Sequence, residues 1–136
     1  MTRFAIDAPT AVRLVEEGFV VPDGHQLVAP NLLRSEAMDL LYRAVRAEAL
    51  DAARAERLLD GLTTMRVRLL GDRVSRAVAW RIATEHGWDD VAPAEYVAVA
   101  RLQADVLVAS DADLVARARG LVELAPVEDL LAVRAP

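Results

Sequence analysis

Three carboxylates are the strongest candidates for chemistry in this sequence: Asp7, Glu36 and Asp111. Asp7 and Asp111 each follow a short apolar run that is typical of a buried strand. In an open α/β sheet, ligands bind beyond the carboxyl ends of the strands, so both acids are predicted to face one crevice. The alternative for either acid alone is helix N-capping, because an aspartate just before a helix accepts hydrogen bonds from its first amides.

Glu36 differs from the two aspartates because it is expected inside a helix. It lies about one turn after Leu33 and one turn before Leu40, which places it at the margin of the apolar stripe. A partly buried carboxylate is costly without a partner, which leaves Arg34, a more distant arginine or a metal ion to neutralise it. Three acids in one pocket repel one another unless a cation holds them, and hard oxygen ligands suit Mg²⁺ or Mn²⁺.

The composition excludes several other kinds of site. The 136 residues include no cysteine, and the 16 basic residues are all arginine. Disulfides, thiolate chemistry and cysteine-bound zinc are therefore excluded, as are Schiff-base and Walker-type sites, which need a lysine. No apolar run is long enough to cross a membrane and no secretory signal opens the sequence, so we expect a cytoplasmic protein with no membrane partner.

The charge is unevenly distributed along the sequence. The net charge is -5, yet residues 54–81 contain seven arginines against three acids. This segment therefore carries +4, which leaves -9 for the rest of the chain. Arg73 and Arg76 lie about one turn apart on a predicted helix and are candidates to bind RNA phosphates, although a solvated helix face explains them equally well.

Strands and helices are predicted to alternate, with short connections between them. Strands are predicted at residues 3–7, 27–29, 65–69, 106–109 and 122–124, and helices at 12–18, 31–48, 51–61, 72–86, 94–102 and 114–119. Glycines end several of these helices, and the strand at 65–69 has the alternating pattern of an edge strand. The alternation indicates one α/β domain spanning residues 1–136, with a mainly parallel sheet covered on both faces.

Four segments, taken in order, carry a resemblance to a known family. They are Phe-Ala-Ile-Asp at 4–7, Leu-Leu-Arg-Ser-Glu-Ala at 32–37, Ala-Glu-Tyr-Val-Ala-Val-Ala at 94–100 and Leu-Val-Ala-Ser-Asp-Ala-Asp-Leu at 107–114. Through their order and spacing, the sequence resembles the PIN-domain family over essentially its whole length. The resemblance is greatest to the VapC-type toxin ribonucleases of bacterial toxin–antitoxin pairs.

The resemblance implies a three-layer α/β/α sandwich and a metal-dependent endoribonuclease. Asp7, Glu36 and Asp111 would bind Mg²⁺ or Mn²⁺ directly or through water, with Asp113 as an auxiliary ligand. The metal would activate a water molecule that hydrolyses RNA. The resemblance also implies a homodimer, and a cognate antitoxin as the partner of a type II toxin.

The sequence departs from the family pattern at two places. Pro93 stands where the family usually has an aspartate, three residues before Tyr96, and proline has no side-chain ligand. Ala109 replaces the usual threonine, with Ser110 beside it. Asp113, or an aspartate of the turn at residues 89–90, is an alternative source of the missing carboxylate. The alternative function is a catalytically impaired PIN-like module that binds RNA or a protein partner.

The tryptophans and histidines are not predicted to act in chemistry. Trp80 and Trp88 are expected to pack in the core or at an interface rather than to stack on bases. His25 and His86 are isolated from each other and from any ligand-pair spacing. Carboxylates alone therefore make up the predicted site.

Overall fold

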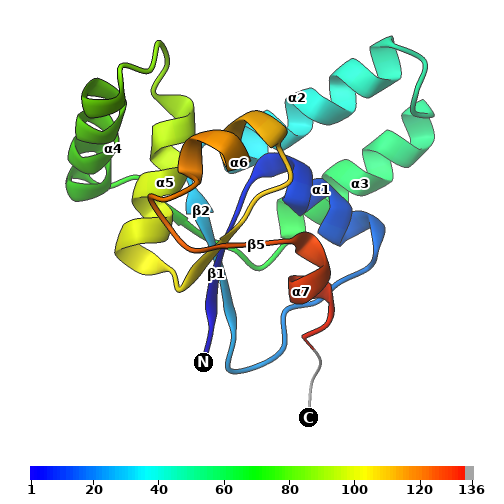
Figure 1. Ribbon diagram of the computed structural model, residues 1–136. Coiled ribbons are helices and arrows are strands. Elements are labelled where there is room, and N and C mark those ends of the chain that lie inside the picture. Colours follow the sequence, from blue (N-terminus) through cyan, green and yellow to red (C-terminus); the bar gives the residue numbers. More distant parts are fainter. Residues whose placement is uncertain (134–136) are drawn as a thin grey trace.

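Five strands form one parallel sheet at the centre of the fold (Figure 1). The computed structural model describes residues 1–133. The strands are β1 (Arg3–Ile6), β2 (Gln26–Pro30), β3 (Arg68–Leu70), β4 (Val106–Val108) and β5 (Leu124–Ala125). They lie in the order β3-β2-β1-β4-β5, and every neighbouring pair is parallel. The predicted α/β class is confirmed, and β3 is an edge strand as expected.

Seven helices within the described residues connect and cover these strands. They are α1 (Ala8–Glu16), α2 (Leu33–Arg46), α3 (Ala52–Thr64), α4 (Arg73–His86), α5 (Ala92–Gln103), α6 (Ala112–Ala118) and α7 (Val127–Leu131). Helices α1, α2 and α3 pack against one another, whereas α5 lies over β1, β2 and β4 and contacts α4. Crossover connections are right-handed, and the chain reverses its direction across the sheet after β3, so the two groups of helices cover opposite faces. The result is a three-layer α/β/α sandwich.

The sheet is buried because its strands are apolar on both faces. In β1, Ala5 pairs with Val28 of β2 on one side and with Leu107 of β4 on the other, and all three are fully buried. The middle of α5, residues 96–100, is also buried, because the sheet lies under it and α4 lies beside it. A helix that is apolar on nearly every side, as α5 is, belongs in such a position.

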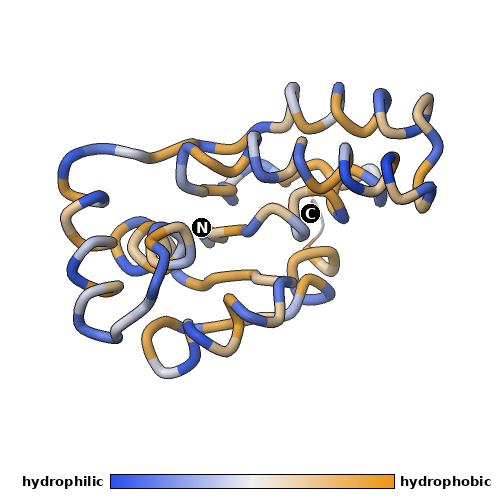
Figure 2. The backbone as a smooth tube through the Cα atoms, turned by 90° about the horizontal axis from the view of Figure 1, so that it is seen from above, coloured by the Kyte–Doolittle hydropathy of each residue, from blue (hydrophilic) through white to orange (hydrophobic). Residues whose placement is uncertain are grey.

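Helices α2 and α3 have the opposite character, since both are amphipathic. In Figure 2 hydrophilic and hydrophobic segments alternate along this pair, which projects to the right of the sheet. Leu33, Ala37 and Leu41 form the buried face of α2, at the i, i+4, i+8 spacing of one helix face. Across the part of the chain that the structure describes, no helix is long and apolar enough to cross a membrane.

The order of the strands creates a crevice beside the central strand. The chain moves from β1 to β2 and β3 on one side, and then returns to β4 on the other side of β1. Adjacent connections therefore leave β1 and β4 in opposite directions, and ligands bind at such a switch point. Asp7 directly follows β1, and Asp111 lies three residues after the end of β4. The fold thus brings both aspartates to the same opening.

Two predicted features of the helices need correction. The sequence predicted that α3 would end at Gly61, but the helix continues to Thr64. Gly61 is a packing residue, because a Cβ at this position would collide with the Val15 side chain of α1. The prediction also missed α7, a five-residue helix that begins after Pro126.

The close approach of α1 and α3 predicts the effect of Gly61→Ala. Overpacking costs about 1–3 kcal/mol, which exceeds the roughly 1 kcal/mol that alanine gains over glycine inside a helix. We therefore expect urea unfolding to show a net loss of stability. In a Val15→Ala background, where space is available, the same change is expected to be neutral or stabilising. A gain in stability in both backgrounds would show that the contact does not constrain these helices.

Candidate active site

The crevice contains a cavity of about 320 Å³ that brings the predicted acids together. It is lined by residues that follow β1 and β4, by one side of α2, and by the start of α5 with the turn before it. The acids of the lining are Asp7, Glu36, Asp39, Asp90, Asp111 and Asp113, and the other residues are Ala8, Pro9, Leu40, Arg43, Ala92, Pro93, Tyr96 and Leu114. Asp7, Glu36, Asp111 and Asp113 therefore share one cavity, as the sequence predicted.

Asp7 is a buried carboxylate with only 2% of its surface exposed. It is the N-cap of α1, and its Oδ1 accepts hydrogen bonds from the Thr10 N–H and hydroxyl groups. Its Oδ2 accepts from the N–H groups of Ser110 (3.0 Å) and Asp111 (2.9 Å). Four donors satisfy the four lone-pair positions of a carboxylate, which offsets the cost of burying its charge.

The Thr10 hydroxyl ties the Asp7 carboxylate to the end of β4. Besides Asp7, its oxygen lies within hydrogen-bond distance of the Val108 carbonyl (3.1 Å) and the Ser110 hydroxyl (2.7 Å). The hydroxyl has one proton, so it donates to only one of these acceptors at a time. Donation to Val108 would leave an Asp7 lone pair open toward Thr10. The hydrogen bond from the Thr10 hydroxyl is therefore the one that can be exchanged, whereas the three N–H groups remain bound to Asp7.

Glu36 lies in the first turn of α2 and is half-buried. Its Oε1 accepts a hydrogen bond from the Tyr96 hydroxyl of α5. Burial raises the pKa of Tyr96, and the hydrogen bond to Glu36 and the nearby negative charges raise it further. Burial also raises the pKa of Glu95, with a second contribution from the charge of Glu36. Burial is the main cause of both pKa shifts, and the negative charges at this end of α5 add to it.

Asp111 is exposed and caps α6. Its Oδ2 accepts a hydrogen bond of 2.9 Å from the Leu114 N–H. The two roles considered for Asp7 and Asp111, helix capping and a place in the site, are therefore compatible. Both residues cap helices and both line the cavity.

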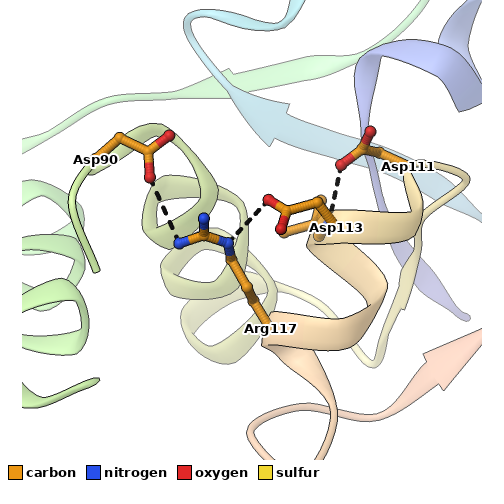
Figure 3. Close-up of polar contacts among 5 residues, drawn as sticks. Asp90, Asp111, Asp113 and Arg117 are labelled. Atoms are coloured by element: carbon orange, nitrogen blue, oxygen red, sulfur yellow. Dashed lines mark hydrogen bonds and ion pairs between the residues drawn. The ribbon is translucent and has the colours of Figure 1, made fainter. Parts of the chain in front are cut away.

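Arginines neutralise three of the six cavity acids. Arg43 pairs with Asp39 at 2.8 Å. Arg117 of α6 lies between the other two, with Asp113 at 2.8 Å and Asp90 at 3.4 Å (Figure 3). Its guanidinium also lies 5.3 Å from the centre of the Trp88 ring, which fixes its position further.

The other three acids of the cavity have no cationic partner. Among residues 1–133, no arginine or histidine forms an ion pair with Asp7, Glu36 or Asp111. Peptide and hydroxyl donors hold Asp7, but Glu36 and Asp111 each retain one carboxylate oxygen without a hydrogen-bond partner in this part of the chain. The unneutralised acids are therefore the three main candidates of the sequence, whereas Asp113, the expected auxiliary ligand, pairs with Arg117.

The chemistry of this donor set fits a hard divalent cation. No group of three or more Asp, Glu or His side chains within residues 1–133 is arranged closely enough to hold a metal ion between them. Mg²⁺, however, keeps several water ligands and is usually bound by only one or two carboxylates. Glu36 and Asp111, through their free oxygens, are the residues that would hold it directly, and Asp7 would act through water.

The positions that depart from the family pattern also lie at this site. Pro93 lines the cavity in the first turn of α5 and offers no ligand there. Asp90 lines the cavity but pairs with Arg117, as Asp113 does, whereas Asp89 is not part of the lining. Ser110 supports Asp7 through its N–H group and is hydrogen-bonded to Thr10 through its hydroxyl. The two proposed substitutes that line the cavity, Asp90 and Asp113, are therefore already partly neutralised.

The arginines that were predicted to bind RNA lie elsewhere. Arg73 and Arg76 begin α4, beside the far end of α5, and do not line the cavity. Arg43 is the arginine that does line it, and it was missed together with its partner Asp39. The i, i+4 spacing of these two residues on a predicted helix was the available signal.

Comparison with known proteins supports the fold. The sequence matches no family model, and no curated protein is significantly similar to it. Among solved structures, the chain is similar to the crystal structure of PAE2754 from Pyrobaculum aerophilum, with 26% sequence identity and a TM-score of 0.74. The match covers 96% of this chain and 93% of that chain. The two chains therefore share one architecture over almost their whole length.

The hydrogen bonds of Asp7 predict that Asp7→Asn destabilises the protein. An asparagine NH₂ group would face an N–H donor, and an unsatisfied buried polar group costs about 1–3 kcal/mol. Urea unfolding measures this loss. The matched control is Asp51→Asn, which alters an exposed cap that accepts one N–H from Arg54. Asparagine caps helices as well as aspartate does, so the control should change little. Equal effects of the two changes would contradict the structural role of Asp7.

The raised pKa of Tyr96 predicts a loss of stability at alkaline pH. Above about pH 10, the tyrosine of the unfolded chain releases its proton, while the folded protein keeps Tyr96 protonated. Stability is therefore fully present below that pH and falls as the pH rises. Urea unfolding across this range should show a smaller fall for Tyr96→Phe, in which Tyr42 is retained. Identical pH profiles for the variant and the wild type would contradict the assignment.

Proposed function

We propose that this protein is a metal-dependent endoribonuclease of PIN type that hydrolyses RNA phosphodiesters. The observation that supports it is the selective neutralisation of the cavity. Arginines pair with Asp39, Asp90 and Asp113, whereas Asp7, Glu36 and Asp111 have no cationic partner among the described residues. Carboxylates around one cavity repel one another, and a divalent cation is the neutralising group that the chemistry of the set favours.

The cation, Mg²⁺ or Mn²⁺, would supply an activated water and neutralise charge on the phosphodiester. The residues of the chain would bind the cation and orient the carboxylates around it. Tyr96 donates a hydrogen bond to one oxygen of Glu36. This bond would fix the orientation of the carboxylate and leave its other oxygen for the cation. Leu114 N–H holds Asp111 in the same way. The Thr10 and Ser110 contacts keep Asp7 in place between the two strand ends.

The biological setting belongs to the same proposal. The protein would act in the cytoplasm as the toxin of a type II toxin–antitoxin pair, as a homodimer, with RNA as substrate and a cognate antitoxin as partner. An arginine from that antitoxin would suit the cavity, because a guanidinium forms bidentate hydrogen bonds with carboxylates. The sequence resemblance supports these expectations, and the fold is compatible with them.

A second candidate is a catalytically impaired module that binds RNA or a protein without cutting RNA. Two observations favour it. Pro93 contributes no carboxylate to the cavity, and four protein donors occupy the lone pairs of Asp7. The second candidate therefore treats Asp7 as a structural cap and the cavity as a remnant.

Calorimetric titration with Mn²⁺ and Mg²⁺, combined with cleavage of a mixed RNA in the same buffers, tests the proposal. We expect the wild type to bind one metal ion and to cut RNA. Glu36→Gln is expected to weaken metal binding at least about tenfold and to abolish cleavage, because it removes one charge and one hard ligand. Glu56→Gln, an exposed acid of α3, is the matched control and should behave as wild type.

The two candidates predict different results in this experiment. A nuclease loses cleavage in Glu36→Gln and keeps it in Glu56→Gln, with circular dichroism unchanged in both. If the wild type binds no metal at millimolar concentration and leaves the RNA intact, the nuclease proposal fails and the binding module is supported. EDTA should abolish cleavage by the wild type under the first proposal.

A further inference from the structure

The outer face of α4 carries a stripe of basic and aromatic side chains, which we call the α4 stripe. It consists of Arg73, Arg76, Ala77, Trp80 and Thr84. At about 100° per residue, these positions fall within roughly 100° of one another on the helix surface. All five are exposed, whereas Ser75, Ala79, Ile82 and Ala83 form the buried face of the helix. Figure 1 shows α4 at the outer edge of the fold, beyond α5.

Trp80 is the least expected residue of this stripe. Its exposed fraction is 72%, which excludes the core position and leaves the surface one of the two that the sequence allowed, core or interface. Tryptophan is usually highly buried, because its ring is the largest apolar surface of any side chain. An exposed indole beside arginines is therefore accessible to a ligand.

The arginines of the stripe are free for a ligand. Within residues 1–133, neither Arg73 nor Arg76 forms an ion pair, in contrast to Arg43 and Arg117 beside the cavity. The nearest acid in sequence, Asp72, accepts hydrogen bonds from Ser75 as the helix cap, and these bonds and the charge of Arg76 lower its pKa. No acidic residue lies on the stripe itself.

We infer that the α4 stripe binds single-stranded RNA, with Trp80 stacking on a base and Arg73 and Arg76 contacting phosphates. Exposed aromatics stack on any base, and arginines beside them follow the backbone charge, which is the usual design of single-strand binding surfaces. The inference rests on the proposed function for its ligand, but not on catalysis. A protein that binds RNA without cutting it would use the same surface.

RNA suits this face better than a second copy of the chain does. A twofold contact joins a surface patch to its own copy, and the α4 stripe has two arginines but no acidic residue to complement them. A polyanion instead gains from every arginine, because each neutralised phosphate releases counterions. The protein as a whole has a net charge of -5, so a local basic face is needed for this binding.

The stripe also leads toward the acidic cavity. Helix α4 begins beside the last turns of α5, where Asp72 and Val74 share a small cavity with Leu102 and Gln103. It ends at Gly87, and the chain then passes through Trp88 to Asp90 in the cavity wall. Helix α4 is about 20 Å long from Arg73 to His86 at 1.5 Å per residue, and a strand bound along it would therefore be directed toward the cavity rim.

The test is binding of a fluorescently labelled single-stranded RNA, followed by anisotropy in EDTA so that metal-dependent cleavage is suppressed. We expect Arg73→Gln/Arg76→Gln and Trp80→Ala each to weaken binding by about tenfold or more. The double variant should also lower the slope of log affinity against log salt by about 1.4, at roughly 0.7 per phosphate contact on a single strand. Trp80→Ala should leave that slope unchanged.

Matched controls separate the stripe from the overall charge. Arg46→Gln/Arg57→Gln removes the same charge from exposed positions on α2 and α3, and Tyr42→Ala removes an exposed aromatic from α2. Both controls should bind RNA within about twofold of wild type. Equal weakening by the control and stripe variants would overturn the inference, as would a wild type that binds no RNA at low salt.

The results are distinguishable from those that test the proposed function. RNA binding lost in the stripe variants but kept in Glu36→Gln supports the stripe, whether or not the wild type cuts RNA. Cleavage with unchanged RNA affinity in the stripe variants supports the nuclease and overturns the stripe. A dimer that dissociates on Trp80→Ala, measured by sedimentation without RNA, would show that α4 is a protein interface and would also overturn the inference.

Discussion

The buried carboxylate of Asp7 is the constraint on which the site depends. The switch of strand order opens a crevice between β1 and β4, and backbone N–H groups at this edge need acceptors. Asp7 accepts from the start of α1 and from Ser110 and Asp111 after β4, so one side chain closes the gap between two strands. These hydrogen bonds therefore fix the Asp111 backbone relative to Asp7. The same contact stabilises the floor of the cavity and brings its acids together.

The arginines beside the cavity determine which acids remain available. Six carboxylates in one lining would be strongly destabilising if all were unpaired. Arg43 and Arg117 neutralise those at the rim, and the Trp88 ring supports Arg117. The remaining charge is concentrated around Glu36 and Asp111, the acids that keep an oxygen free in the described structure. The same arrangement keeps Asp113 from acting as a simple replacement for the carboxylate missing at Pro93.

Local pattern was sufficient to predict most of the fold and to select Asp7, Glu36 and Asp111 of the cavity lining, but not Asp39 and Arg43. Apolar strands that end in aspartate locate Asp7 and Asp111, and helical periodicity places Glu36 at the edge of a buried stripe. Interactions between segments that are far apart in the sequence could not be predicted from local pattern. Arg117 meets Asp90 only because α6 packs near the turn after α4, and Gly61 continues a helix because Val15 of another helix approaches it. The choice between core and interface for Trp80 was left open for the same reason, because the exposed side of α4 depends on where α5 lies.

Acidic and basic side chains lie on different surfaces of the protein, as they lie in different parts of the sequence. The acidic cavity repels a polyanion until a cation neutralises the cavity. The arginines of α4 have no acidic partner in the described residues, so they attract a polyanion. Under the proposals made above, binding and chemistry therefore use different surfaces. Energy gained along α4 would hold RNA near a cavity whose own charge opposes it. Remote binding energy offsets the cost of bringing a phosphate to an unfavourable site. In a chain with net charge -5, a local group of unpaired arginines would thus provide the phosphate contacts that the overall charge does not favour.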